Sequence, residues 1–160
     1  MTIHLDLFDE QDYSLFAQVL QNPQVMKNIT GHAIDDDSVQ KAWENRLMPI
    51  NAKNEVAGYY KILLDGNYIG YGKLSFDDVI FDRPCIEIGY FLLPEFWGWG
   101  IGYQVGLRLI NLAHHYGYPI IATVSQENHI SKKLLGKLNF CFDKMIELDG
   151  KMGEVWVLKD

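Results

Sequence analysis

The feature that most constrains the fold is a strand that passes through closely spaced glycines into a helix, in the middle of the chain. Residues 86–93 read Ile-Glu-Ile-Gly-Tyr-Phe-Leu-Leu, a run typical of a strand. Gly98, Gly100 and Gly102 follow at a spacing of two, and residues 101–116 carry apolar side chains at helical spacing. The free N–H groups of such a helix point back at the turn and can bind phosphate. The same turn also fits close packing of a helix on a sheet.

Two familiar phosphate-binding motifs do not match this turn. No glycine-lysine pair in the chain is followed by Ser or Thr, which excludes a P-loop. The dinucleotide fingerprint needs a third glycine, but counting from Gly98 that position is Tyr103, and counting from Gly100 it is Val105. A dinucleotide-dependent oxidoreductase is therefore disfavoured.

Apolar periodicity predicts a mixed order of elements in one α+β domain over residues 1–160, a length of about one domain. The lack of regular strand and helix alternation excludes a Rossmann fold. Ser38 is expected to cap the second helix, and Asn139 to take a left-handed conformation after the last. The expected strands are 2–8, 60–64, 68–76, 86–93, 120–124, 142–148 and 154–158, and the expected helices are 9–20, 38–48, 101–116 and 130–138.

Composition limits the partners. The 14 Lys and Arg against 21 Asp and Glu give a net charge of −7 with no basic run, which disfavours nucleic-acid binding. Such a charge, with the run Asp35, Asp36 and Asp37, suits a cationic substrate without demonstrating one. The acidic run is also typical of a helix start.

The N-terminus and the cysteines indicate the compartment. The chain has neither a basic, apolar leader at its start nor 18 consecutive apolar residues, so we expect a cytoplasmic protein that does not enter a membrane. Cys85 and Cys141 stand apart in apolar runs, which predicts two buried, reduced thiols and no metal site.

Residues 87–102, with the sequence EIGYFLLPEFWGWGIG, resemble the acetyl-CoA-binding segment of the GNAT superfamily of N-acetyltransferases. The Trp-Gly pairs are similar to its ribosomal-protein N-acetyltransferase (RimJ/RimL-like) branch. The superfamily pattern is Gln or Arg, two residues, Gly, one residue, Gly or Ala. Gly100 and Gly102 fit its last positions, whereas Trp97 replaces the commoner Gln or Arg, as in that branch.

A second stretch, residues 128–140, resembles the family's N-x-x-S…K-L-G-F box, with Asn139 in place of the glycine. Together with the element order, the resemblance covers nearly the whole chain, although the first 50 residues match only in that order. It implies a central, mostly antiparallel, twisted sheet of about seven strands flanked by about four helices.

The resemblance implies acetyl-CoA as co-substrate, with no metal. Backbone groups would hold its pantetheine arm and pyrophosphate. The residues that the resemblance assigns to the co-substrate are Phe91, Leu92, Leu93, Trp97, Gly98, Trp99, Gly100, Ile101, Gly102, Asn128 and Ser131.

Two residues match catalytic positions of the family. Glu87 corresponds to an acidic position that serves as base in some members, directly or through water, but an ion pair with Lys73 would explain it equally well. Ser131 corresponds to a serine proposed as acid, but it can also be a hydroxyl that satisfies the start of its helix. Many members have an acid tyrosine four positions after this serine, where this chain has Leu135.

The acceptor implied by the resemblance is a small-molecule amine or a protein N-terminus, such as a polyamine or an aminoglycoside. Tyr59 and His32 are candidate acceptor-binding residues, and of the pair Tyr59 and Tyr60 one is expected in the core. A monomer or homodimer is expected. The main alternative function is a non-catalytic module that binds or senses acyl-CoA, which would need no Glu87 or Ser131.

Overall fold

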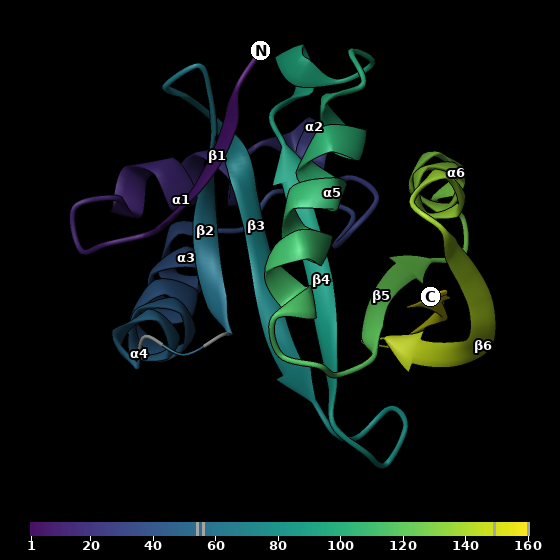
Figure 1. The fold of residues 1–160 in the computed structure, drawn as a ribbon. Helices are drawn as coiled ribbons and strands as arrows, with labels where there is room; N and C mark the ends of the chain where they lie inside the picture. The colour runs from purple at the N-terminus through teal and green to yellow at the C-terminus, as the bar shows by residue number, and fades with distance from the viewer. Residues whose placement is uncertain (54, 56, 149, 160) are drawn as a thin grey trace.

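The structure is a computed structural model that describes residues 1–53, 55, 57–148 and 150–159. Seven strands in the described residues form one sheet (Figure 1). Their bounds are β1 Ile3–Leu7, β2 Gly58–Leu64, β3 Asn67–Asp77, β4 Cys85–Leu92, β5 Ile120–Ser125, β6 Phe140–Leu148 and β7 Lys151–Leu158. The α-helices are α1 Tyr13–Leu20, α2 Pro23–Met26, α3 Asp36–Ala42, α4 Met48–Ala52, α5 Ile101–His114 and α6 His129–Lys137, with a π-helical turn at Trp43–Leu47 and a 3-10 turn at Pro94–Phe96.

The sheet has the order β1-β2-β3-β4-β5-β7-β6. All neighbouring strands are antiparallel except β4 and β5, which are parallel. This parallel pair needs a crossover connection, and α5 supplies it. The mixed, mostly antiparallel sheet that the sequence predicted is therefore confirmed.

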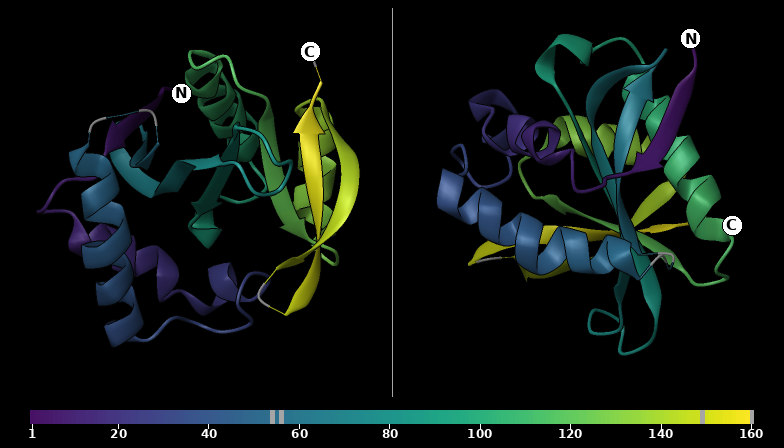
Figure 2. Two further views of the ribbon diagram at one scale, coloured as in Figure 1. Left: turned by 90° about the horizontal axis from the view of Figure 1, so that it is seen from below. Right: turned by 90° about the vertical axis from the view of Figure 1, so that its left-hand side faces the viewer.

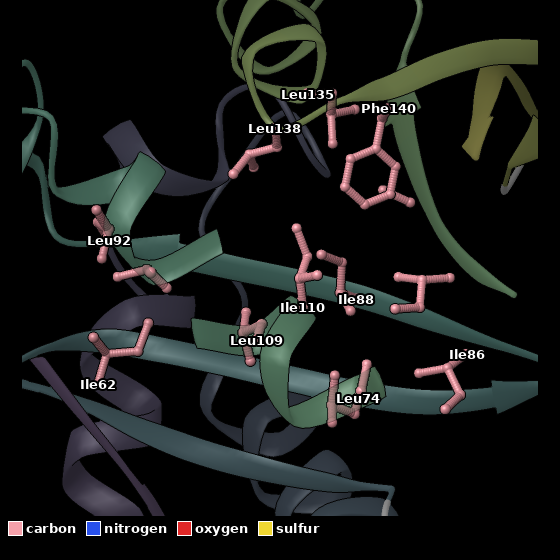
Figure 3. Packing of buried hydrophobic residues seen from close by; sticks show 14 of the residues in the cluster. Ile62, Leu74, Ile86, Ile88, Leu92, Leu109, Ile110, Leu135, Leu138 and Phe140 are labelled. Carbon is pink, nitrogen blue, oxygen red and sulfur yellow. The ribbon is translucent and has the colours of Figure 1, made fainter. Parts of the chain in front are cut away.

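The two faces of the sheet carry different helices (Figures 1 and 2). On one face, α5 and α6 pack on a core made by the apolar side chains of β2 to β5 (Figure 3). On the other face, α1 and the helical segment over residues 36–52 enclose an aromatic cluster above β1 to β3. Phe16, Trp43, Tyr59 and Tyr71 belong to this second cluster, with ring centroids 5.4–6.5 Å apart in its contacting pairs.

Helix starts are where the sequence prediction needs correction. Ser38 is not the cap of the second long helix. Asp35 is, because its carboxylate accepts a 2.8 Å hydrogen bond from the Ser38 N–H. The first helix ends at Leu20, as predicted, but the short helix α2 that follows it is not expected from the sequence pattern. Pro23 instead occupies the first turn of α2, where a proline needs no N–H donor.

Several local predictions are confirmed. Asp65 and Gly66, both with positive φ, form the turn between β2 and β3, and Asn139 has a φ of 73° after α6. Gly150 lies between β6 and β7, whereas Asp149 of that expected turn lies outside the described residues. Both cysteines are free thiols; Cys85 is buried, but Cys141 is only half-buried.

No helix in the described part of the chain has the length and hydropathy needed to cross a bilayer. The same residues contain no group of three or more His, Cys, Asp or Glu arranged to hold a metal ion.

Candidate active site

The parallel strands β4 and β5 separate soon after they meet. Their pairing covers only Ile86 with Ile120 and Glu87 with Ile121. Beyond this point β4 continues to Leu92 beside β3, while β5 pairs only with β7 and turns away (Figure 1). One edge of β4 is therefore left without a strand partner in the middle of the sheet.

Backbone groups of alternate β4 residues point toward this divergence. The Ile86 N–H donates to the Pro119 carbonyl on the β5 side at 2.9 Å, and the Leu93 N–H donates to the Ile69 carbonyl on the β3 side at 2.8 Å. Because neighbouring residues of a strand direct their backbone groups to opposite edges, Tyr90 and Leu92 point to the β5 side. Of the predicted run from Phe91 to Leu93, it is thus Leu92 whose backbone faces the divergence, with Tyr90 beside it.

The Trp97 side chain is hydrogen-bonded to the end of β4. Its indole Nε1–H donates a 2.8 Å hydrogen bond to the Leu92 carbonyl, which therefore has a partner although no strand lies there. Trp99, two residues on, is 75% exposed. The two tryptophans of the glycine turn consequently have different surroundings, one tied to the strand and the other open to a ligand.

The glycines after β4 are required for different reasons. Gly98 and Gly100 have φ values of 79° and 77°, and a Cβ at either would meet no atom within 4 Å. Gly102 has ordinary φ, but its Cβ would lie 3.2 Å from the Leu134 side chain of α6. The first two glycines set the turn that begins α5, and the third allows α5 to approach α6.

The start of α6 lies beside the start of α5 through this contact. Asn128 caps α6, because its side-chain oxygen accepts a 3.2 Å hydrogen bond from the Ser131 N–H. Ser131 is half-buried, one helical turn before Leu134, the residue that contacts Gly102. The contact between Leu134 and Gly102 therefore puts α6 beside the start of α5, with Ser131 one turn before the contact.

Glu87 lies where β4 and β5 begin to separate, on the face opposite α5. Its carboxylate accepts a 2.8 Å hydrogen bond from the Thr123 hydroxyl of β5. No ion pair joins it to Lys73 in the described residues; Lys73 is opposite Gly89, and Ser75 is opposite Glu87. Glu87 is half-buried, so its carboxylate is accessible to a ligand.

Tyr59 belongs to the aromatic cluster and is only 7% exposed, as expected for one member of its pair. Burial raises the pKa of Tyr59, the Arg46 guanidinium beside its hydroxyl opposes the rise, and the Glu87 carboxylate adds to it. The Tyr59 hydroxyl therefore lies on the same face of the sheet as Glu87. Tyr60 packs instead against the core under α5.

In the described structure, His32 forms its hydrogen-bond contact within its own loop. It is exposed in the loop before α3, where its Nδ1 is 2.9 Å from the Ala33 carbonyl. No hydrogen bond links it to Glu87 or Ser131 in the described part of the structure. His32 as an acceptor-binding residue stays a prediction.

The three aspartates at the start of α3 each form a local contact. Asp35 caps the helix, Asp36 accepts a hydrogen bond from Gln21, and Asp37 pairs with Lys41 at 2.9 Å. These contacts are those of a helix start favoured by the dipole.

Two surface hollows lie elsewhere. One of about 370 Å³ is next to the loop after β1, and one of about 300 Å³ lies between β1 and α5. Neither is lined by Glu87 or Ser131. The candidate site at the divergence of β4 and β5 is therefore identified from its functional groups and not from either hollow.

Sequence reasoning missed two residues, Thr123 and Arg46, on the face of the sheet that carries Glu87. Thr123 could have been found, because a polar residue inside the apolar strand Ile120–Ser125 needs a hydrogen-bond partner. Arg46 carried no such signal, since its place beside Tyr59 depends on helix packing.

Comparison with known proteins agrees with this geometry. The family model described as "Acetyltransferase (GNAT) domain" matches residues 2–141. No curated protein sequence matches the chain significantly.

Solved structures share the fold at low identity. AAC(6')-Ib, solved with paromomycin and acetyl-CoA, has a TM-score of 0.82 and 18% identity over 99% of this chain and 93% of its own. The same aminoglycoside acetyltransferase with coenzyme A and kanamycin has a TM-score of 0.79 and 17% identity, covering 98% and 94%. An acetyltransferase from Agrobacterium tumefaciens has a TM-score of 0.78 and 18% identity, covering 99% and 91%.

The family match spans most of the sequence and includes the diverging strands β4 and β5 and the glycine turn. The chain therefore belongs to the GNAT acetyltransferase family.

Proposed function

We propose that this domain transfers an acetyl group from acetyl-CoA to a primary amine by direct attack in a ternary complex. The observation that carries the proposal is that β4 and β5 separate directly after Glu87, next to a glycine turn that opens a long helix. Strand β4 thus offers a binding edge and a base, and the start of α5 offers an anion site. The structurally similar AAC(6')-Ib was solved with acetyl-CoA, which supports the choice of co-substrate.

The residues present fit acetyl-CoA. The β4 edge at Tyr90 offers a backbone N–H and carbonyl on the β5 side, which suit the amides of the pantetheine arm. The N-terminus of α5 after Gly100 suits the pyrophosphate, because free N–H groups and the helix dipole both favour an anion. Trp99 is free to cover the ligand.

Glu87 is the proposed base. It removes a proton from the ammonium form of the acceptor, directly or through water, so that the amine can attack the thioester carbonyl carbon. The C–N bond forms as the C–S bond breaks, and the proton that the attacking nitrogen then loses balances the one that the departing CoA thiolate takes up. The Thr123 hydroxyl holds the Glu87 carboxylate in one orientation.

Ser131 is the proposed donor to the departing thiolate. Its backbone N–H already serves the Asn128 cap, so its hydroxyl is the group left for the ligand. Leu135 lies where many family members have a tyrosine, and it is buried in the core. Leucine has no proton to donate, so Ser131 is the acid that we propose at the start of α6.

Release of CoA thiol, measured with acetyl-CoA and a panel of amines, tests this function. We expect thiol release that depends on the amine, a mass gain of one acetyl group on the acceptor, and thermal stabilisation by acetyl-CoA but not by NAD. Glu87→Gln should lower kcat and keep the stabilisation. Stabilisation without turnover of any amine would instead support the acyl-CoA-binding module.

A further inference from the structure

The face of the sheet around Glu87 is only partly covered. Lys73, Glu87, Gly89, Phe91 and Thr123 are each half-buried and share the face opposite α5. The helical segment over residues 36–52 and the β6–β7 hairpin lie on either side of these central strands (Figure 2). An acceptor amine that reaches Glu87 from this face must contact these side chains.

Lys73 lies on the same face of the sheet as Glu87, opposite a position two residues further along β4. The register puts it between Tyr59 of β2 and Gly89 of β4. Its Cε and Cγ lie 3.4 and 3.7 Å from the position of a Cβ at Gly89, so the aliphatic chain crosses the strand there. The absent side chain of Gly89 leaves room for this path.

The ammonium of Lys73 has no ion pair in the described residues, where the three ion pairs use Lys41, Lys61 and Lys132. An anionic ligand can therefore pair with this ammonium without displacing a carboxylate of the protein. The chain has 21 acidic residues against 14 basic ones, so the absence of a carboxylate at Lys73 does not follow from a shortage of acids.

Arg46 adds a second cation on the same face. Its guanidinium lies beside the Tyr59 hydroxyl, and Tyr59 is directly opposite Lys73 in the sheet. Arg46 forms none of the carboxylate pairs of the described structure. Two positive groups and a tyrosine hydroxyl thus lie on the face of the sheet that carries the proposed base.

We infer that the acceptor is a small primary amine that also carries a carboxylate, of the amino-acid class, with its carboxylate on Lys73 and Arg46 and its amine at Glu87. This inference rests on the proposed acetyl transfer. Positions two residues apart on one strand are about 7 Å apart. This is the spacing between Glu87 and Gly89, the residue that Lys73 crosses, and it suits a small acceptor that carries both an amine and a carboxylate. A polycation would instead meet repulsion from both basic groups.

The test compares free amino acids with their amides and with the corresponding decarboxylated amines, by kcat/KM for thiol release. Wild-type protein should prefer the free acids. Lys73→Gln should reduce kcat/KM for the free acids by about 10- to 100-fold, the usual loss for a charge-assisted hydrogen bond, and leave the amides nearly unchanged. Lys73→Arg should retain most of the preference, and Arg46→Gln should lower it in the same direction.

Lys159→Gln is the matched control, because Lys159 is exposed after β7 and its side chain has no part in the site. Stabilisation by acetyl-CoA, measured for every variant, shows that the fold and the co-substrate site persist. Turnover of the amides, polyamines or aminoglycosides at rates equal to or above those of the free acids overturns this inference while acetyl transfer stands. Absence of both turnover and acetyl-CoA stabilisation overturns the proposed function, and this inference with it.

Discussion

The Thr123 hydroxyl donates a 2.8 Å hydrogen bond to the Glu87 carboxylate, across the point where β4 and β5 separate. The bond joins the proposed base to the strand that turns away from it. It therefore fixes the side-chain orientation of Glu87 at the end of the parallel pairing. A group that must meet an amine in one geometry gains from such a fixed orientation.

Replacing Thr123 by Val should lower kcat by about 10-fold with a smaller change in KM, because the carboxylate loses the donor that orients it. Thr123→Ser keeps the hydroxyl and should keep most of the activity. Steady-state kinetics of the three proteins provide the measurement. Equal kcat for Thr123→Val and wild type would show that the hydrogen bond has no positioning role.

Gly100→Glu should abolish the thermal stabilisation by acetyl-CoA, because it places a carboxylate at the N-terminus of α5 where the pyrophosphate is expected. The left-handed backbone there, with φ of 77°, also makes any side chain strained by about 1 kcal/mol.

Gly66→Glu is the matched control for this strain. Gly66 has a φ of 85° with no atom within 4 Å of its Cβ position, in the turn between β2 and β3. Both variants should lose about 2–4 °C in Tm. Only Gly100→Glu should lose the response to acetyl-CoA, and a persistent response there would make the glycine turn purely structural.

Gly106 and Gly136 should respond to alanine in opposite directions. A Cβ at Gly106 of α5 would lie 2.5 Å from Leu138 Cδ1 and 3.3 Å from the Tyr90 hydroxyl, so Gly106→Ala should destabilise by about 1–3 kcal/mol. A Cβ at Gly136 of α6 would meet nothing within 4 Å, so Gly136→Ala should stabilise by about 0.5–1 kcal/mol. Urea denaturation measures both changes, and a stabilising Gly106→Ala would contradict the close packing of α5 on α6.

Cys85 should resist thiol reagents in the folded protein at neutral pH. Burial, with the Asp77 and Glu87 carboxylates nearby, raises the pKa of Cys85 to about 11 from its ordinary value of 9.0. The thiolate, which is the reactive form, is therefore scarce below that pH. A disulfide reagent should modify Cys141 first, and Cys141→Ser protein should react only on unfolding.

The same pKa gives the sign of a pH effect on stability. The unfolded chain loses the Cys85 proton at a lower pH than the folded chain, so between pH 9 and 11 the unfolded state binds fewer protons. This contribution to stability is present below pH 9 and is lost as pH rises toward 11. Cys85→Ala should flatten that part of the profile measured by urea denaturation.

Local sequence determined most of the elements and the co-substrate side of the site. Alternation and helical spacing are properties of neighbouring residues, so the strands and the long helices could be predicted, and the left-handed backbone at Gly98 and Gly100 is likewise a local property of the glycine turn. Asn139 also acts within one turn of chain, and its left-handed conformation after α6 followed from residue type.

Tertiary structure alone decided how the acceptor side is built. Thr123 meets Glu87 because β5 returns parallel to β4 after a helix, and Lys73 crosses Gly89 because β3 and β4 pair in one register. The cap of α3 also depends on the folded backbone, since both Asp35 and Ser38 are good caps by residue type and only the backbone selects Asp35. Contacts between residues far apart in sequence depend on strand register and helix packing, and no local pattern encodes these.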